Sequence, residues 1–211
     1  TVDGLKLIVD YQDPALKSPA HVEMAGKIVA DMKQQLVDIT GLQLAASYPE
    51  KSLKSPATVK VLGDVHANLG TQQIQMPSLT VHASYPAANL KSPATLKLNA
   101  AITADLKQQI VSLANITADA AYPDSTRPAP ITATINGAIT ANLTSGAVNF
   151  APLDLQASLS DKAFPKVMPI HLTAPISANW KEGKIALNGF SLDALSIKTK
   201  GQLQAYLPAL A

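Results

Sequence analysis

The hexapeptide LKSPAT at residues 53–58 returns unchanged at residues 90–95, and a near copy, LKSPAH, stands at residues 16–21. The copies are spaced 37 residues apart. A period of this length is typical of an array built from one repeated supersecondary unit. The repeat therefore predicts the architecture of the chain.

The same register continues where the hexapeptide fades, in a column of tyrosines and two columns of alanines. These are Tyr11, Tyr48, Tyr85 and Tyr122; Ala30, Ala67, Ala104, Ala141 and Ala178; and Ala46, Ala83, Ala120, Ala157 and Ala194. We interpret residues 1–211 as a single repeat domain with no internal boundary. Its parts are a partial unit at 1–15, repeats at about 16–52, 53–89, 90–126, 127–163 and 164–200, and a tail at 201–211.

Within a unit the apolar residues recur at every second position, which is the pattern of a half-buried strand. A short polar break follows each such strand, for example KQQ at residues 33–35 and 107–109, and predicts a hairpin turn. The apolar phase of the returning strand slips by one residue after Met76, where Pro77 and Ser78 intervene, so we expect a β-bulge there. The Ser-Pro of the hexapeptide predicts a turn into the next unit.

Two strands per unit predict an all-β, elongated, curved antiparallel sheet of about 11–12 strands, each about 35–40 Å long. One face of every strand is apolar and has to be covered. Two solutions remain open: an apolar groove covered by another molecule, or a closed β-sandwich whose inner faces interdigitate.

In the first solution the groove is lined by aliphatic side chains of the apolar phase. The predicted lining is Val59, Val61, Val65, Leu69, Leu79, Val81, Leu96, Leu98, Ile102, Leu106, Ile116, Ile135, Ile139, Leu143, Leu153, Leu155, Leu172 and Ile176. A stripe of small residues is predicted at Gly26, Gly63, Ala67, Ala104, Gly137 and Ala141. Such a stripe is typical of close backbone packing or strong bending, and it would equally form a channel for an alkyl chain.

The composition of the chain argues against several classes of function for this protein, beginning with nucleic-acid binding. The net charge is +2, without a block of like charge, so nucleic acid is not an expected partner. The chain contains no cysteine. The four histidines, His21, His66, His82 and His171, all fall on the polar phase, where we expect them to face solvent and not a metal. No nucleophile elbow, phosphate-binding loop or zinc spacing occurs, so we predict a protein without catalytic activity, metal or cofactor.

The repeat with its Leu-x-Ser-Pro opening, Ala-Asp-Leu strand end and Lys-Gln-Gln hairpin, clearest at residues 16–123, resembles the repeats of the AsmA family. These are bacterial envelope proteins related to TamB. The resemblance implies a periplasmic repeating β-groove, an inner-membrane anchor outside this segment, and movement of phospholipid towards the outer membrane. The expected partners are phospholipid acyl chains and the two membranes.

The alternative, from another class, is a structural β-sandwich that serves as a spacer or adhesion module without a ligand. The tyrosine column fits either class, because it can form an aromatic girdle at a groove lip or cap the strand ends with its hydroxyls in water. We favour the strand-end caps.

Overall fold

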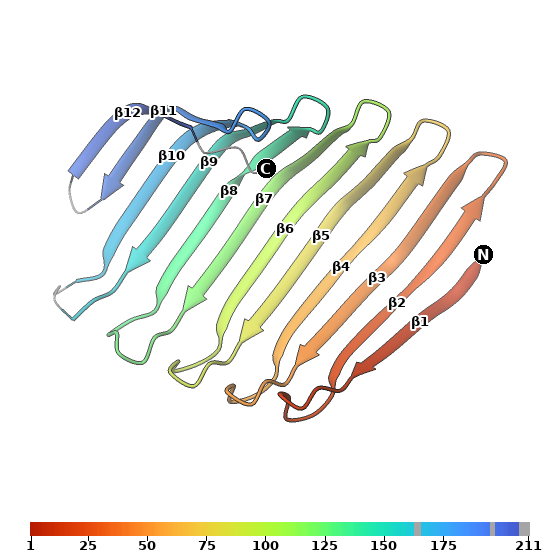
Figure 1. The fold of residues 1–211 in the computed structure, drawn as a ribbon, viewed down its shortest axis with the longest axis horizontal. Helices are drawn as coiled ribbons and strands as arrows, with labels where there is room; N and C mark the ends of the chain where they lie inside the picture. Colours follow the sequence, from red (N-terminus) through yellow and green to blue (C-terminus); the bar gives the residue numbers. More distant parts are fainter. Residues whose placement is uncertain (163–165, 195–196, 207–211) are drawn as a thin grey trace.

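The computed structural model of the chain describes residues 1–162, 166–194 and 197–206, which form one antiparallel sheet of 12 strands (Figure 1). The strands are β1 Val2–Tyr11, β2 Ala20–Asp31, β3 Leu36–Tyr48, β4 Ala57–Asn68, β5 Gln73–Tyr85, β6 Ala94–Asp105, β7 Ile110–Tyr122, β8 Ile131–Asn142, β9 Ala147–Leu159, β10 Met168–Asn179, β11 Lys184–Ala194 and β12 Ile197–Tyr206. Their order in the sheet is their order in the sequence. Residues 207–211 of the expected tail lie outside the described residues.

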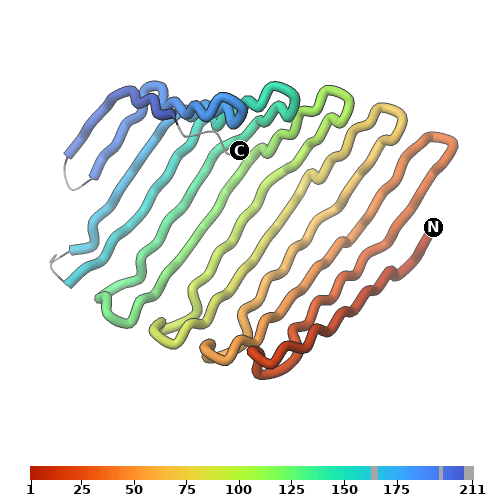
Figure 2. Tube along the Cα trace, in the orientation of Figure 1, coloured from red at the N-terminus to blue at the C-terminus, as the bar shows by residue number. Residues whose placement is uncertain are grey.

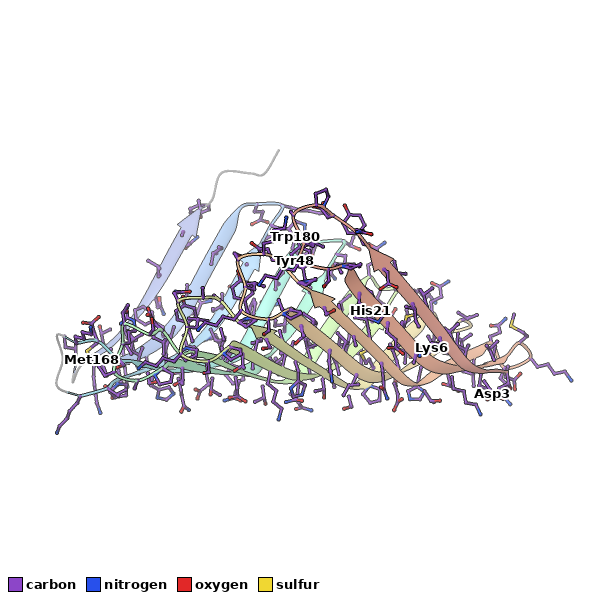
Figure 3. All side chains as sticks on the ribbon, turned by 90° about the horizontal axis from the view of Figure 1, so that it is seen from below. Asp3, Lys6, His21, Tyr48, Met168 and Trp180 are labelled. Carbon is purple, nitrogen blue, oxygen red and sulfur yellow. The ribbon has the colours of Figure 1, made fainter. Side chains whose placement is uncertain are left out.

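The sheet is a single open layer. Each described strand contacts only its neighbours in sequence, and Figure 3 shows the sheet from the side as a twisted, curved ribbon with side chains on both faces. The predicted all-β antiparallel sheet is thus confirmed, and the alternative of a closed β-sandwich is wrong. The physical reason is that each strand lies beside the strand that precedes it in the sequence, so the described strands build no second layer.

Hairpin turns follow the even-numbered strands from β2 to β10, all at the same ends of the strands (Figure 2). The turn after β2 ends at Gln35 with φ of 57°, and Asp31 accepts hydrogen bonds from the turn backbone, at 2.9 Å from Lys33 N. Neighbouring turns are joined, because Leu69 N donates to Gln35 O at 2.8 Å. The turns predicted from the polar breaks are therefore present, and they stack along the repeat.

The odd-numbered strands β1 to β11 each contain a bulge. The predicted bulge in β5 is confirmed, since the pairing register shifts between Met76 and Leu79. Strand β9 has the same kind of bulge around Pro152. In β3 and β7 the bulge instead contains a residue with positive φ, Gly41 at 62° and Asn115 at 53°. Two bulge types therefore occur within one repeat pattern.

The connectors at the opposite edge hold the most buried large side chains of the described residues. Leu16, Leu53 and Leu90, the first residue of each hexapeptide copy, are 6%, 3% and 2% exposed. Leu53 forms a β-bridge with Ala87 of the following connector, and Leu90 forms one with Asp124. The leucine of the hexapeptide therefore anchors each unit to the next.

The lysine of the hexapeptide completes this joint with two hydrogen bonds. Lys54 N donates to Pro86 O at 3.0 Å, and Lys54 Nζ donates to Leu90 O at 2.6 Å. Lys17 makes the equivalent Nζ bond to Leu53 O at 2.5 Å. The motif recurs because its leucine is buried and its lysine satisfies carbonyl groups of the next repeat, in addition to the turn formed by Ser-Pro.

The joint changes after the copy of the hexapeptide at residues 90–95. Arg127 stands where the earlier units have leucine, and its Nη1 donates to Ser160 O at 2.6 Å and to Asp161 Oδ2 at 3.1 Å. Ser160 is buried, and its hydroxyl accepts from Ala129 N at 3.0 Å. Polar contacts therefore replace the buried leucine where the hexapeptide fades, and the sheet continues without interruption.

Candidate functional site: the apolar face

Cross-strand pairing places the apolar side chains in rows that run across the whole sheet. Residues paired directly across two strands point to the same face. One row begins Leu44, Val61, Val81 and Leu98. Four more rows run parallel to it, and we call the surface they form the apolar face.

All predicted lining residues that lie in strands fall on this face. They occupy four rows: Val59 and Leu96; Val61, Val81, Leu98, Ile135, Leu155 and Leu172; Leu79, Ile116 and Leu153; and Val65, Ile102, Ile139 and Ile176. The remaining three, Leu69, Leu106 and Leu143, stand in the hairpin turns at the edge. The register therefore brings the lining residues together on one surface.

No part of residues 1–162, 166–194 or 197–206 covers this surface. Val59, Leu96 and Ile135 are exposed, the three turn leucines are 50–54% exposed, and the other lining residues are half-buried. In a closed core such side chains would be fully buried. The described part of the chain thus presents a continuous aliphatic surface to its surroundings.

The apolar face is wider than the predicted lining. Leu7 and Met24 extend one row into β1 and β2, while Phe150 and Leu187 extend another through β9 and β11. These residues share the alternation of the central units, so the same pattern would have found them. Trp180, in the turn after β10, adds an exposed aromatic side chain at the hairpin edge.

The small residues occupy two rows and alternate there with large ones. Gly63 stands between Leu42 and Leu79, and Ala104 stands between Ile74 and Val111. Gly26 and Gly137 share the row of Gly63, and Ala67 and Ala141 share that of Ala104. The register therefore does not join the six predicted residues into one uninterrupted channel.

At two positions, glycine is required because a backbone atom of the neighbouring strand lies too close for a Cβ. A Cβ at Gly63 would lie 2.7 Å from the backbone O of Ser78, and one at Gly137 would lie 2.6 Å from the backbone O of Pro152. Both oxygens belong to the proline-containing bulges. A Cβ at Gly26, opposite the Gly41 bulge, would meet its nearest atom at 3.5 Å, which is ordinary contact. The bulge type in the neighbouring strand thus decides where only glycine fits.

The tyrosine column ends strands β1, β3, β5 and β7 at the connector edge, and all four rings are exposed. Tyr11 Oη donates to Asp13 Oδ2 at 3.4 Å, and Tyr122 Oη accepts from Asn89 Nδ2 at 3.4 Å. These positions agree with the expected strand-end caps whose hydroxyls lie in water.

The opposite face of the sheet is polar and carries ion pairs. Lys27 Nζ lies 2.8 Å from Asp3 Oδ1, and Lys6 Nζ lies 2.8 Å from Glu23 Oε1. The hydrogen bonds from these lysines lower the pKa of both carboxyl groups. Both pairs join the outermost strand β1 to β2, so they help to hold β1 in register with β2.

The histidines lie on this polar face, as their phase predicts. Three of them contact a carboxylate: His21 with Asp10 at 2.7 Å, His66 with Asp38 at 2.7 Å and His171 with Asp154 at 3.2 Å. Within the described ranges, no group of three or more histidine, aspartate or glutamate side chains is placed to hold a metal ion.

Shallow hollows occur where the bulges reach the polar face. One, of about 610 Å³, is lined by residues that include Thr117, Asn136 and Asp154, and another, of about 260 Å³, by residues that include Gln43 and Thr80. Their linings mix these polar residues with residues of the apolar-face rows, Ile116 and Gly137 in the first and Leu42 and Gly63 in the second.

Comparisons of the chain with models of protein families, with curated proteins and with solved structures found no match. In the part of the chain that the structure describes, no helix has the length and apolar character needed to cross a membrane. The candidate site is therefore defined by the chain's own geometry.

Proposed function

We propose that the apolar face binds the acyl chains of phospholipids and that this chain is a segment of a lipid conduit between the inner and outer membranes of bacteria. The observation that carries the proposal is the uncovered aliphatic surface extending from β1 to β12. It fits a ligand that is long, apolar and variable in length. The lipid is held without a covalent step, and the segment acts by binding alone.

The size of the surface supports an apolar ligand. A sheet of 12 strands about 4.8 Å apart, each about 40 Å long, has a face of roughly 2,000 Å². The largest apolar patch on a typical soluble monomer is about 300–600 Å² and is often functional. Each acyl methylene that is buried contributes about 0.8 kcal/mol of binding free energy. A lipid chain of about a dozen methylenes therefore has enough apolar surface to bind to this face.

The composition of the rows supports movement along the face. Aliphatic residues recur at every strand, and no charged side chain interrupts the row of Val61, Val81 and Leu98. A uniform lining offers similar binding free energy at each step, so an acyl chain can slide from repeat to repeat. The direction of movement must then come from the membranes or from other segments. The resemblance to AsmA repeats supports a periplasmic setting and an anchor in the inner membrane.

Site-specific photo-crosslinking in bacteria tests the proposal. A photo-reactive residue at Ile102, on the apolar face, is expected to capture phospholipid, and one at the adjacent Thr103, on the polar face, is expected to capture none. Equal labelling at both positions would contradict a lipid site on the apolar face. Native mass spectrometry of the purified chain should show bound phospholipid, whereas lipid-free dimers would indicate that a second copy covers the face.

A blocking substitution supplies the functional control. Ala104→Trp places an indole on the open face, where no second layer opposes it, so the melting temperature should change little while lipid co-purification falls. The matched control is Thr103→Trp on the polar face, which should retain lipid. A stable Ala104→Trp protein that carries as much lipid as the parent would overturn the conduit.

A further inference from the structure

One histidine on the polar face differs from the other three. His82 has no carboxylate partner and is paired across the sheet with Lys60 on one side and Lys97 on the other. The three side chains come from the adjacent strands β4, β5 and β6, and all are exposed. Adjacent strands lie about 4.8 Å apart, so three nitrogen-bearing side chains stand in one row about 10 Å long.

The row of Lys60, His82 and Lys97 has one acidic residue among its directly paired neighbours, Asp119 beside Lys97. Ala45 lies beyond Lys60, and Asp119 lies beyond Lys97. Asp119 Oδ1 accepts a hydrogen bond from Thr134 at 2.7 Å, and no ion pair joins it to Lys97. Lys60 and Lys97 stand two strands apart on either side of His82, so an anion bound over His82 would face both ammonium groups.

A parallel row of hydroxyl groups lies beside the basic row. Ser84 is paired with Thr58 on one side and Thr95 on the other, two residues along the same three strands and on the same face. The surface therefore combines two ammonium groups, an imidazole and three hydroxyl donors. A phosphate monoester has three terminal acceptor oxygens and a charge of about −1.5 to −2 at pH 7. It can accept from both lysines at once, which a carboxylate with one charge matches less well.

We infer that Lys60, His82 and Lys97, with the adjacent hydroxyl groups, form a binding site for a phosphate monoester on the polar face. The site lies on the face opposite the proposed acyl-chain surface and is independent of it. It gives the sheet a second ligand class, recognised by charge and hydrogen bonding.

The test is a titration of the chain with inorganic phosphate at constant ionic strength. The resonances of the histidine rings are monitored by NMR during the titration. The His82 resonances should shift and saturate, while those of His21, which is paired with Asp10, should not. Removing either lysine, as Lys60→Gln or Lys97→Gln, should weaken the affinity about two- to fivefold, the amount expected for one exposed ion pair. Lys198→Gln is the matched control, since Lys198 is paired with Asp193 at the far end of the sheet.

The inference is overturned if His82 does not respond, if its shift fails to saturate, or if the Lys60→Gln/Lys97→Gln double variant binds phosphate as the parent does. Sedimentation with vesicles identifies the source of the phosphate group. Co-sedimentation with phosphatidylcholine vesicles containing phosphatidic acid, but not with phosphatidylcholine alone, indicates a lipid headgroup. Binding of free phosphate without vesicle binding indicates a soluble ligand. Ala104→Trp should leave the phosphate affinity unchanged, which separates this site from the proposed lipid function.

Discussion

Leucines at the connector edge and on the apolar face differ sharply in burial. Leu53 and Leu90 at the connectors are 3% and 2% exposed, whereas Leu96 and Leu106 on the face and at its edge are 41% and 54% exposed. The first pair joins one repeat to the next, and the second pair contacts no covering layer. The aliphatic residues of this chain therefore divide into a buried set that joins the repeats and a set that is left exposed on the open face.

The largest expected effect is at the joint. Leu90→Ala should lower the free energy of unfolding by about 2–5 kcal/mol, because it removes a fully buried side chain and leaves a cavity. Leu96→Ala, on the open face, should cost less than about 1 kcal/mol. Urea unfolding followed by Trp180 fluorescence measures both. Equal losses would erase the distinction between the two sets.

A methyl group added on the apolar face should destabilise the fold only where backbone atoms of the neighbouring strand lie close to it. Gly63→Ala places a Cβ 2.7 Å from the Ser78 carbonyl oxygen and should destabilise by about 1–3 kcal/mol through overpacking. Gly26→Ala, in the same row, meets only ordinary contacts and should be neutral or stabilising by up to about 1 kcal/mol. Thermal unfolding of the two variants decides the matter. Similar melting temperatures would show that the Pro77 bulge yields to the added methyl group.

The lysine of the joint should contribute less than its leucine. Lys54→Met keeps the aliphatic stem but removes the hydrogen bond to Leu90 O, so we expect a loss of about 1 kcal/mol. Lys33→Met, at an exposed hairpin turn, is the control and should have little effect. Amide hydrogen exchange at the connectors should quicken in the first variant only. Unchanged exchange there would mean that the backbone bond of Lys54 suffices.

The smallest expected effect is the pH dependence of stability at the joint near Arg127, where the hexapeptide fades. The backbone N–H and the hydroxyl of Thr126 donate to Asp124 and lower the pKa of its carboxyl below the ordinary 3.8. Since the folded pKa is the lower one, the stabilisation is present above the unfolded pKa and is lost as the pH falls through the folded pKa. Asp124→Asn should therefore flatten the decline of the melting temperature below about pH 4. An unchanged acid profile would show that Asp124 does not contribute.

Much of the fold could be predicted from the sequence. The alternation of Val59, Val61 and Val65 identified a strand and its apolar phase, and the break after Met76 located a bulge that the register confirms. These features are local: side chains alternate along a strand, and proline removes a backbone donor. Such rules act within a few residues, so the sequence alone was sufficient to predict the strand and its bulge.

The joint between repeats was only half predicted. The sequence marked Ser-Pro as a turn, but the burial of Leu53 and the bond from Lys54 Nζ to Leu90 O depend on a residue 36 positions further on. The same holds for Gly63, whose smallness is required by the Ser78 carbonyl of the neighbouring strand. Such contacts are set by how two strands pair, which the alternation within one strand does not specify.

By itself, the sequence determined that this protein is an array of antiparallel strands with one aliphatic face, because the two-residue period of the pleat and the 37-residue repeat are both written in the order of residues. Only the tertiary structure decided that the face stays open. Every strand pairs with its sequence neighbour, so the described residues place no second layer over the apolar rows. Tertiary structure also decided which leucines are buried, because the joint forms only when two connectors lie side by side.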